Sequence, residues 1–98
     1  MKALKLEGTS VREIEVENSV PALQKEVLGF FETIPIVREQ AIMIVNEEGM
    51  YLGMSINLSA SAISGQTIVG PALVVGVDGN EFCDIPSDIS ALIRLRWR

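Results

Sequence analysis

Two short stretches near the start of the chain alternate hydrophobic and polar residues. The first is residues 2–7, KALKLE, in which the alternation is imperfect. The second is residues 11–17, VREIEVE, in which it is strict from Glu13 onward, and Gly8-Thr9-Ser10 separates the two. A period of two residues on either side of a glycine-containing turn is typical of paired antiparallel strands. The pattern therefore predicts a β-hairpin.

A helix is predicted to follow this hairpin. Asn18 and Ser19 are residue types that cap free backbone N–H groups. Pro21 is tolerated in a first turn, because a backbone N–H there would have no partner within the helix. Apolar residues then share one face at helical spacing: Val20, Leu23, Val27, Phe30 and Phe31. We expect this helix to end at about Phe31 or Glu32, with Gly29 disfavouring its last turn by about 1 kcal/mol.

Three further stretches have the length and composition of strands. Residues 33–37 are rich in β-branched side chains but contain Pro35, which favours an edge strand or a lead-in. Residues 41–46, AIMIVN, are almost continuously apolar and predict a central strand buried on both faces. Glu47-Glu48-Gly49 then indicates a turn, after which we expect Met50-Tyr51-Leu52 to return as the partner strand.

The second half of the chain is less regular. Residues 55–66, SINLSASAISGQ, predict either a short helix around 58–63 or an ordered loop, and residues 72–77 predict another strong strand. Near the end, Ser87 or Asp88 is expected to cap a last helix, whereas residues 93–98, IRLRWR, alternate like a strand. We expect a helix that gives way to an extended tail.

Together these elements predict one α+β domain over residues 1–98. Its sheet is expected to be mainly antiparallel, with one or two helices packed on one face. Residues 94–98 are expected to form a basic tail or an edge strand. The hydrophobic fraction of 48% argues against disorder, which requires low hydrophobicity and high net charge.

The composition also limits where the protein acts. No apolar run approaches the roughly 18–20 residues that span a bilayer, and the first residues, MKALKLEG, are too polar for a signal peptide. We therefore expect a cytoplasmic protein that does not bind membranes. The single cysteine, Cys83, agrees with a reducing compartment and is interpreted as a structural or incidental residue.

The common catalytic arrangements are missing from the sequence. The chain contains no histidine, so Ser-His and Cys-His nucleophile pairs and the usual zinc-ligand sets are excluded. No glycine-rich phosphate-binding pattern is present either. Carboxylate chemistry stays open in principle, but we interpret the thirteen acidic residues mainly as solvated surface. We expect a protein that is not an enzyme and needs no cofactor or metal.

The acidic residues allow two interpretations. Glu13, Glu15 and Glu17 would stand roughly 6.7 Å apart on one strand face, twice the rise per residue, whereas one DNA strand presents a charge about every 3.4 Å. Mimicry of nucleic-acid phosphates would therefore require the fold to add other carboxylates, namely Glu7, Glu47 and Glu48. An ordinary solubilising face is the interpretation we favour.

The basic end of the chain contrasts with the net charge of −5. Arg94, Arg96, Trp97 and Arg98 could bind a phosphate backbone and stack on a base. They could equally form an edge strand, or neutralise acidic surface on this molecule or on a second copy. We favour the edge strand or the neutralisation of acidic surface over nucleic-acid binding, because three charges are few for nucleic-acid affinity and the acidic body would repel the ligand. Direct nucleic-acid binding is thus not expected. An exposed Trp97 that alternates with arginines would allow a homodimer to form by edge pairing.

Three blocks of the sequence resemble the domain-of-unknown-function family 3846. They are IEVENSVPALQKEVLGFFETIPI, AIMIVNEEGMYLGMSIN and IVGPALVVGVDGNEF, within about residues 1–85. The segment LSASAISGQ and the ending IRLRWR depart from the family pattern. The family occurs mainly in phages, prophages and plasmids of Firmicutes, so the resemblance implies a role in the contest between mobile elements and their hosts.

We therefore expect a non-catalytic phage or mobile-element protein that inhibits a bacterial defence component by protein–protein contact, with a CRISPR effector as the sharpest candidate. One alternative is an oligomeric sponge for a signalling nucleotide, with residues 55–65 and the tail arginines as phosphate contacts. Another is an accessory or assembly module. The candidate partner-binding residues are Glu13, Glu15, Glu17, Glu47, Glu48, Tyr51, Arg94, Arg96, Trp97 and Arg98.

Overall fold

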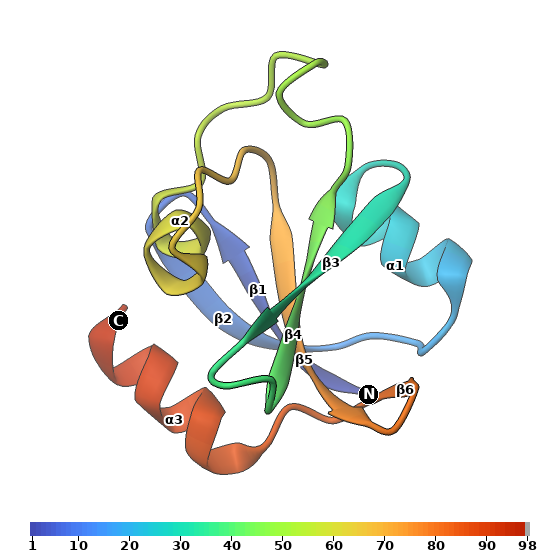
Figure 1. The fold of residues 1–98 in the computed structure, drawn as a ribbon, viewed down its shortest axis with the longest axis vertical. Coiled ribbons are helices and arrows are strands. Elements are labelled where there is room, and N and C mark those ends of the chain that lie inside the picture. The colour runs from blue at the N-terminus through green and yellow to red at the C-terminus, as the bar shows by residue number, and fades with distance from the viewer. Residues whose placement is uncertain (98) are drawn as a thin grey trace.

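The predicted N-terminal hairpin is present in the computed structural model, which describes residues 1–97 (Figure 1). Strands β1 (Lys2–Glu7) and β2 (Ser10–Glu15) pair antiparallel over their full length. Side chains of β1 alternate between the two faces of the sheet, and four consecutive residues from Ala3 to Leu6 are buried. Strand β1 therefore lies inside the sheet, and β2 forms one of its edges.

Within residues 1–97 the sheet has six strands, and every pairing is antiparallel. The order is β2-β1-β5-β4-β3, and β6 pairs with β5. The remaining strands are β3 (Phe31–Ile36), β4 (Ala41–Asn46), β5 (Ala72–Asp78) and β6 (Glu81–Cys83). The two strongest apolar runs of the sequence are β4 and β5 at the centre of the sheet, and the proline-containing β3 lies at its edge, as predicted.

The predicted partner strand at Met50-Tyr51-Leu52 is wrong. These three residues lie in a turn, and the partners of β4 are β3 on one side and β5 on the other. Both hydrogen-bonding edges of β4 are thereby occupied, so the chain that leaves β4 has no edge to pair with. It departs from the sheet instead.

Helix α1 (Val20–Val27) begins as predicted and ends earlier than predicted. The Ser19 hydroxyl accepts a hydrogen bond from the Ala22 N–H at 3.3 Å, which makes Ser19 the N-cap. Leu28 adopts a left-handed conformation (φ 67°) and stops the helix, and Phe31 belongs to β3. The buried Lys5 holds α1 against β1, because its Nζ donates to the Glu26 carbonyl oxygen at 2.8 Å and to Glu26 Oε1 at 3.2 Å.

Two more helices follow in the second half of the chain. Helix α2 (Leu58–Ser64) confirms the helical interpretation of that serine-rich segment. Helix α3 (Ser87–Arg96) is longer than expected, and its N-cap is Pro86 rather than Ser87 or Asp88. The described part of the alternating IRLRWR segment, residues 93–97, is therefore helical as far as Arg96 and forms no edge strand. Its pattern is misleading because Ile93 and Trp97, four residues apart, both pack on the core.

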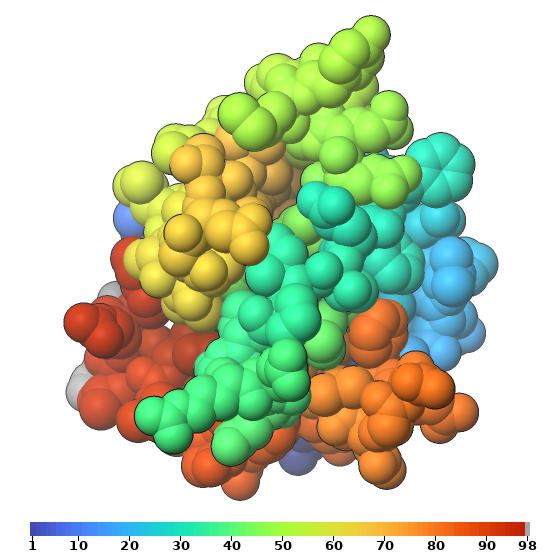
Figure 2. Space-filling view, viewed as in Figure 1, coloured from blue at the N-terminus to red at the C-terminus, as the bar shows by residue number. Residues whose placement is uncertain are grey.

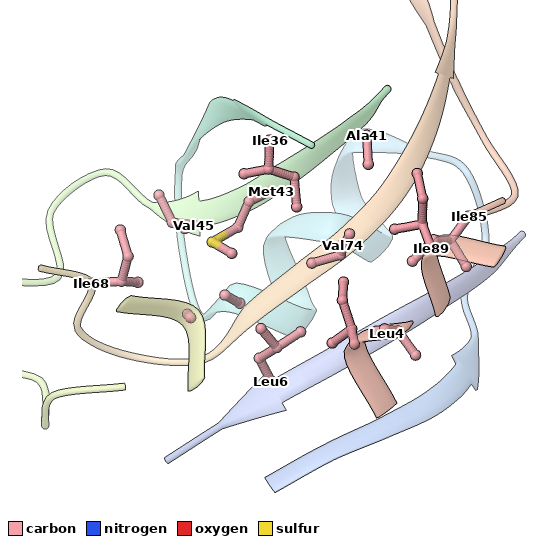
Figure 3. Packing of buried hydrophobic residues seen from close by; sticks show 13 residues of the cluster. Leu4, Leu6, Ile36, Ala41, Met43, Val45, Ile68, Val74, Ile85 and Ile89 are labelled. Atoms are coloured by element: carbon pink, nitrogen blue, oxygen red, sulfur yellow. The ribbon is translucent and has the colours of Figure 1, made fainter. Parts of the chain in front are cut away.

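Helices cover both faces of the sheet, not the single face that was expected. One core cluster lies under α1 and contains Ala3, Leu23, Val27, Ile44, Leu73 and Val75. The other lies under α2 and α3 and includes Leu4, Leu6, Met43, Val74, Ile89 and Ile93 (Figure 3). The α+β class with an antiparallel sheet is confirmed. Three layers result, with residues of β4 and β5 alternating between the two cores.

The path from β6 to α3 depends on Gly76 in the middle of the sheet. A Cβ atom at this position would overlap the backbone carbonyl oxygen of Asp84 and lie 2.9 Å from Cys83 Sγ. The absence of a side chain lets the chain after β6 run close over β5. Ile85 then donates its N–H to the Lys2 carbonyl oxygen at 2.9 Å and enters the core under α3.

We predict that Gly76→Ala destabilises the protein by about 1–3 kcal/mol, because the added methyl group meets main-chain atoms that have little freedom to move. Urea denaturation followed by circular dichroism measures the change. Glu81→Ala on the neighbouring exposed position is the control and should cost less than about 0.5 kcal/mol. Equal stability of Gly76→Ala and wild type would contradict the close crossing.

Candidate interaction surface

The segment that leaves β4 forms an ordered loop that projects beyond the ends of the strands (Figures 1 and 2). We call residues 47–57 the β4–α2 loop. Within it, the Leu52 N–H donates to the Glu48 carbonyl oxygen at 2.8 Å, and the Met54 N–H donates to the Gly49 carbonyl oxygen at 3.0 Å. These bonds close the tip of the loop into consecutive turns.

The returning half of the loop is bonded to the segment that precedes β5. The Gly70 N–H donates to the Ser55 carbonyl oxygen and the Asn57 N–H to the Ile68 carbonyl oxygen, each at 2.8 Å. Ile56 and Val69 form an isolated antiparallel bridge between these contacts. Backbone hydrogen bonds therefore support the loop at its tip and along its return.

Asn57 fixes the loop to the body of the protein at its second end. The side chain is 1% exposed. Its Nδ2 donates to the carbonyl oxygens of Leu6 and Gly70, each at 2.8 Å, and its Oδ1 accepts from the Ser59 hydroxyl at 3.0 Å and the Ala60 N–H at 3.1 Å. One amide group thus connects the end of β1, the start of β5 and the N-terminus of α2.

Asn46 has the corresponding role at the first end of the loop. It is the last residue of β4 and is buried. Its Nδ2 donates to the Val27 carbonyl oxygen at 3.0 Å, and its Oδ1 accepts from the Glu48 N–H at 2.7 Å. The loop therefore begins and ends at a buried asparagine that is bonded to a different part of the fold.

The tip of this supported loop is apolar and exposed. Met50, Tyr51 and Leu52 have 72%, 90% and 57% of their surface exposed. Two further apolar side chains, Leu28 and Phe30, are exposed in the connection between α1 and β3, which is bonded to the start of the loop through the Glu47 N–H and the Phe30 carbonyl oxygen. We call Met50, Tyr51 and Leu52 the loop tip.

A hollow lies on each side of the loop. The first has a volume of about 310 Å³ and a largely apolar lining that includes Leu28, Met54, Ile56 and Pro71. The second has a volume of about 300 Å³, is lined in part by Met50 and Tyr51, and has the carboxylates of Glu32 and Glu47 at its border. The loop therefore presents an apolar tip between an apolar hollow and an acidic one.

Of the candidate residues named from the sequence, Glu47, Glu48 and Tyr51 lie together in this loop. All three are exposed. The strand glutamates are elsewhere: Glu15 pairs with Lys2 in the register of the hairpin, whereas the hairpin turn at Glu7 and Gly8 borders the apolar hollow. Residues 10–15 of β2 span roughly 17 Å, so Glu15 lies about that far from the hairpin turn. None of Glu13, Glu15 and Glu17 lines either hollow beside the loop.

The strand glutamates have partners within the molecule. Glu13 Oε2 lies 3.7 Å from Arg94 NH2, and Glu15 Oε2 lies 3.3 Å from the N-terminal amino group. Glu17 lies beyond the end of β2 and is exposed. Arg94 therefore neutralises acidic surface of its own chain, which is one of the roles expected for the basic end.

Arg96 and Trp97 lie close to α2 rather than in an extended tail. Together with Ala62 and Ile63 they line a hollow of about 340 Å³. Trp97 is half-buried and packs against the core, which corrects the expectation of an exposed tryptophan at a sheet edge. Arg98, also named as a candidate, lies outside the described residues.

The serines proposed as phosphate contacts are used inside the fold. The Ser59 hydroxyl donates to Asn57 Oδ1, and the Ser61 hydroxyl donates to the Ile68 carbonyl oxygen at 3.2 Å and accepts from the Ile68 N–H at 2.8 Å. The Ser64 hydroxyl likewise accepts from the Gln66 N–H at 3.2 Å. These groups stabilise α2 and its connection to the next segment.

Two other kinds of site were sought in residues 1–97. No group of three or more His, Cys, Asp or Glu side chains in that range is arranged to hold a metal ion. None of the helices in the same range is both long and apolar enough to cross a membrane.

Sequence reasoning missed several residues of this surface. The sequence pattern places Met50 and Leu52 in a strand, Phe30 on the apolar face of a helix and Leu28 near the end of the same helix. The available signal was the turn Glu47-Glu48-Gly49, which places an apolar triplet directly after a strand. Recognising its exposure requires the knowledge that β4 has no free edge.

We predict that Asn57→Ala destabilises the protein by about 3 kcal/mol. The change removes the donors to the Leu6 and Gly70 carbonyl oxygens and the cap of α2, and each lost buried partner costs about 1–3 kcal/mol. Urea denaturation measures the loss, with the exposed Gln66→Ala as control. A loss no larger than that of the control would show that the amide does not support the loop.

Comparison with known proteins places the chain in a family. No curated protein and no solved structure matches it. Residues 1–97 match the family described as Domain of unknown function (DUF3846), which covers every element described above. The sheet, its helices and the β4–α2 loop are therefore the fold of a member of the DUF3846 family.

Proposed function

We propose that this protein acts without catalysis, by binding another protein through the β4–α2 loop. The observation that supports the proposal is the loop tip, where three consecutive large apolar residues are exposed on a segment held by backbone hydrogen bonds and two buried asparagines. The absence of histidine from the whole sequence agrees with a role that needs no proton transfer at neutral pH.

The loop tip has the properties of a binding hot spot. Single exposed apolar residues are common, but adjacent ones that form a continuous apolar patch mark interaction sites. Tyrosine is enriched at the centres of protein interfaces, where its ring contributes a large contact area at small cost in side-chain entropy. Because the loop is already ordered, binding does not require further ordering of its backbone, which favours affinity.

The surroundings of the loop tip define the chemistry of the partner. Glu32, Glu47 and Glu48 carry negative charge beside it, and the whole chain has a net charge of −5. A partner surface with an apolar pocket bordered by lysine or arginine would complement this arrangement. A nucleic acid would not, since its phosphates carry the same sign of charge.

We further propose that the partner is a bacterial defence component and that the protein acts in the cytoplasm of the host cell. This part of the proposal rests on the resemblance to a family of phage, prophage and plasmid proteins. A CRISPR effector is the sharpest candidate, because such effectors carry basic surfaces that bind nucleic acid. An acidic protein with an apolar tip could occupy such a surface.

We predict that the triple variant Met50→Ser, Tyr51→Ser, Leu52→Ser loses inhibition while staying folded. Removing three anchors at an interface should weaken binding on the order of 100-fold or more. Phage plating on a host with an active CRISPR system, with and without the expressed protein, measures inhibition. Capture from the same lysate, with identification of the bound protein, measures binding.

The matched control is Val20→Ser with Val37→Ser, which removes exposed apolar side chains away from the loop tip. This control should inhibit like the wild type. Two results would overturn the proposal: wild-type protein that neither inhibits interference nor retains a defence protein, or a triple variant that remains as active as the control.

The nucleotide-sponge alternative has less support in the geometry. The serine hydroxyls of α2 are bonded internally, and of the tail arginines Arg94 pairs with Glu13. Among the tail arginines within residues 1–97, Arg96 lies beside a hollow near α2.

We predict that cyclic nucleotides at a large excess leave the unfolding temperature unchanged. A ligand present at 100 times its dissociation constant would add about 2.7 kcal/mol of stability. Thermal shift over a panel of cyclic nucleotides measures this. A rise of several degrees with one nucleotide would favour the sponge.

A further inference from the structure

Helix α3 has an apolar stripe on its outer face, away from the core. Ile89, Ser90 and Ile93 are buried, whereas Leu92 and Leu95 are 65% and 62% exposed. Ala91 and Leu95 follow Asp88 by three and seven residues. This helical spacing places Asp88, Ala91 and Leu95 on one exposed face of the helix. A stripe of this kind is typical of a helix that packs against another helix.

A groove beside the helix extends this surface. It lies between β2 and α3, has a volume of about 450 Å³, and is lined by Val11, Ala91, Arg94 and Leu95. Arg94 borders it while paired with Glu13 of β2. The groove therefore joins Ala91 and Leu95 of the helix to Val11 of the edge strand.

The charges at the two ends of α3 are opposite and symmetric. Asp88 lies in the first turn and Arg96 in the last, and each is four residues from Leu92. Both side chains are exposed, and within residues 1–97 neither forms an ion pair. When a second copy of the helix runs in the opposite direction, the Asp88 of each copy therefore faces the Arg96 of the other.

We propose that two copies of this chain form a homodimer through antiparallel packing of their α3 helices about Leu92. Each Leu92 then contacts its counterpart, and each Asp88 lies beside Arg96 of the other copy, so the dimer contains this charge pair twice. The antiparallel arrangement also places opposite ends of the helix dipoles together. A two-fold contact uses the same patch on both copies, which a self-complementary surface satisfies.

This contact differs from the predicted edge-strand dimer and does not depend on the proposed function. Figure 1 shows α3 and the β4–α2 loop at opposite ends of the longest dimension of the molecule. Both loops therefore stay free in the dimer. A partner with two binding sites within reach would then be held by both.

Sedimentation equilibrium of the full chain, from micromolar to several hundred micromolar, tests the proposal. The expected result is a concentration-dependent mass that reaches twice that of one chain. Leu92→Arg should leave only monomer, and circular dichroism should show that it is folded because the replaced side chain is exposed. Tyr51→Arg, in the loop tip, should dimerise like the wild type.

A charge exchange tests the orientation of the two helices. Asp88→Arg and Arg96→Asp should each weaken the dimer about tenfold, and the double variant should recover to within about threefold of wild type. A wild type that is monomeric throughout, or a dimer that Leu92→Arg leaves intact, would overturn the proposal. A double variant no better than the single ones would overturn the antiparallel register.

Discussion

The hydrogen bonds of the Asn57 side chain are the constraint on which the β4–α2 loop and its junction with the sheet depend. Three chain segments meet at this point: the end of β1, the approach to β5 and the first turn of α2. Each presents a main-chain group that must find a partner away from water, because an unpaired buried amide or carbonyl costs free energy. A single side-chain amide has both donors and an acceptor, so it satisfies all three segments. No purely apolar residue could replace it.

This arrangement explains how an apolar tip remains exposed. A flexible loop containing Met50, Tyr51 and Leu52 would be expected to fold back over the nearest apolar surface. Here the loop starts at Asn46 and ends at Asn57, both of which are buried and bonded to the body of the protein. Backbone hydrogen bonds to residues 68–70 fix the second half of the loop, residues 55–57. The geometry of the support keeps the tip in water, and binding to a partner would bury it.

The sequence predicted those parts of the fold that depend on local pattern. Strands β4 and β5 are central because their runs are apolar on both faces, and Ser19 begins α1 because its hydroxyl accepts from the helix. The failures concern long-range geometry. Met50-Tyr51-Leu52 could not be recognised as exposed without knowing that β3 and β5 occupy both edges of β4. Residues 93–97 alternate like a strand, but a helix lets both Ile93 and Trp97 contact the core, and the chain is helical as far as Arg96.

The candidate surface was predictable only in part for the same reason. Glu47, Glu48 and Tyr51 were named from their types, but nothing in the spacing of Glu13 and Glu15 indicated that Arg94 and the N-terminus would neutralise them. Pairs that join distant segments are set by the fold as a whole. The same holds for the Ser61 hydroxyl of α2, whose partner Ile68 lies after the helix.

The bonds that shape the β4–α2 loop come from the main chain and from two asparagines, and none of them uses a side chain of Met50, Tyr51 or Leu52. The residues proposed to bind a partner and the residues that hold the loop are therefore different positions. Because of this separation, the amino acids at the loop tip can change without loss of the fold, as is common in surface loops. It also makes these three positions a natural place for a randomised library.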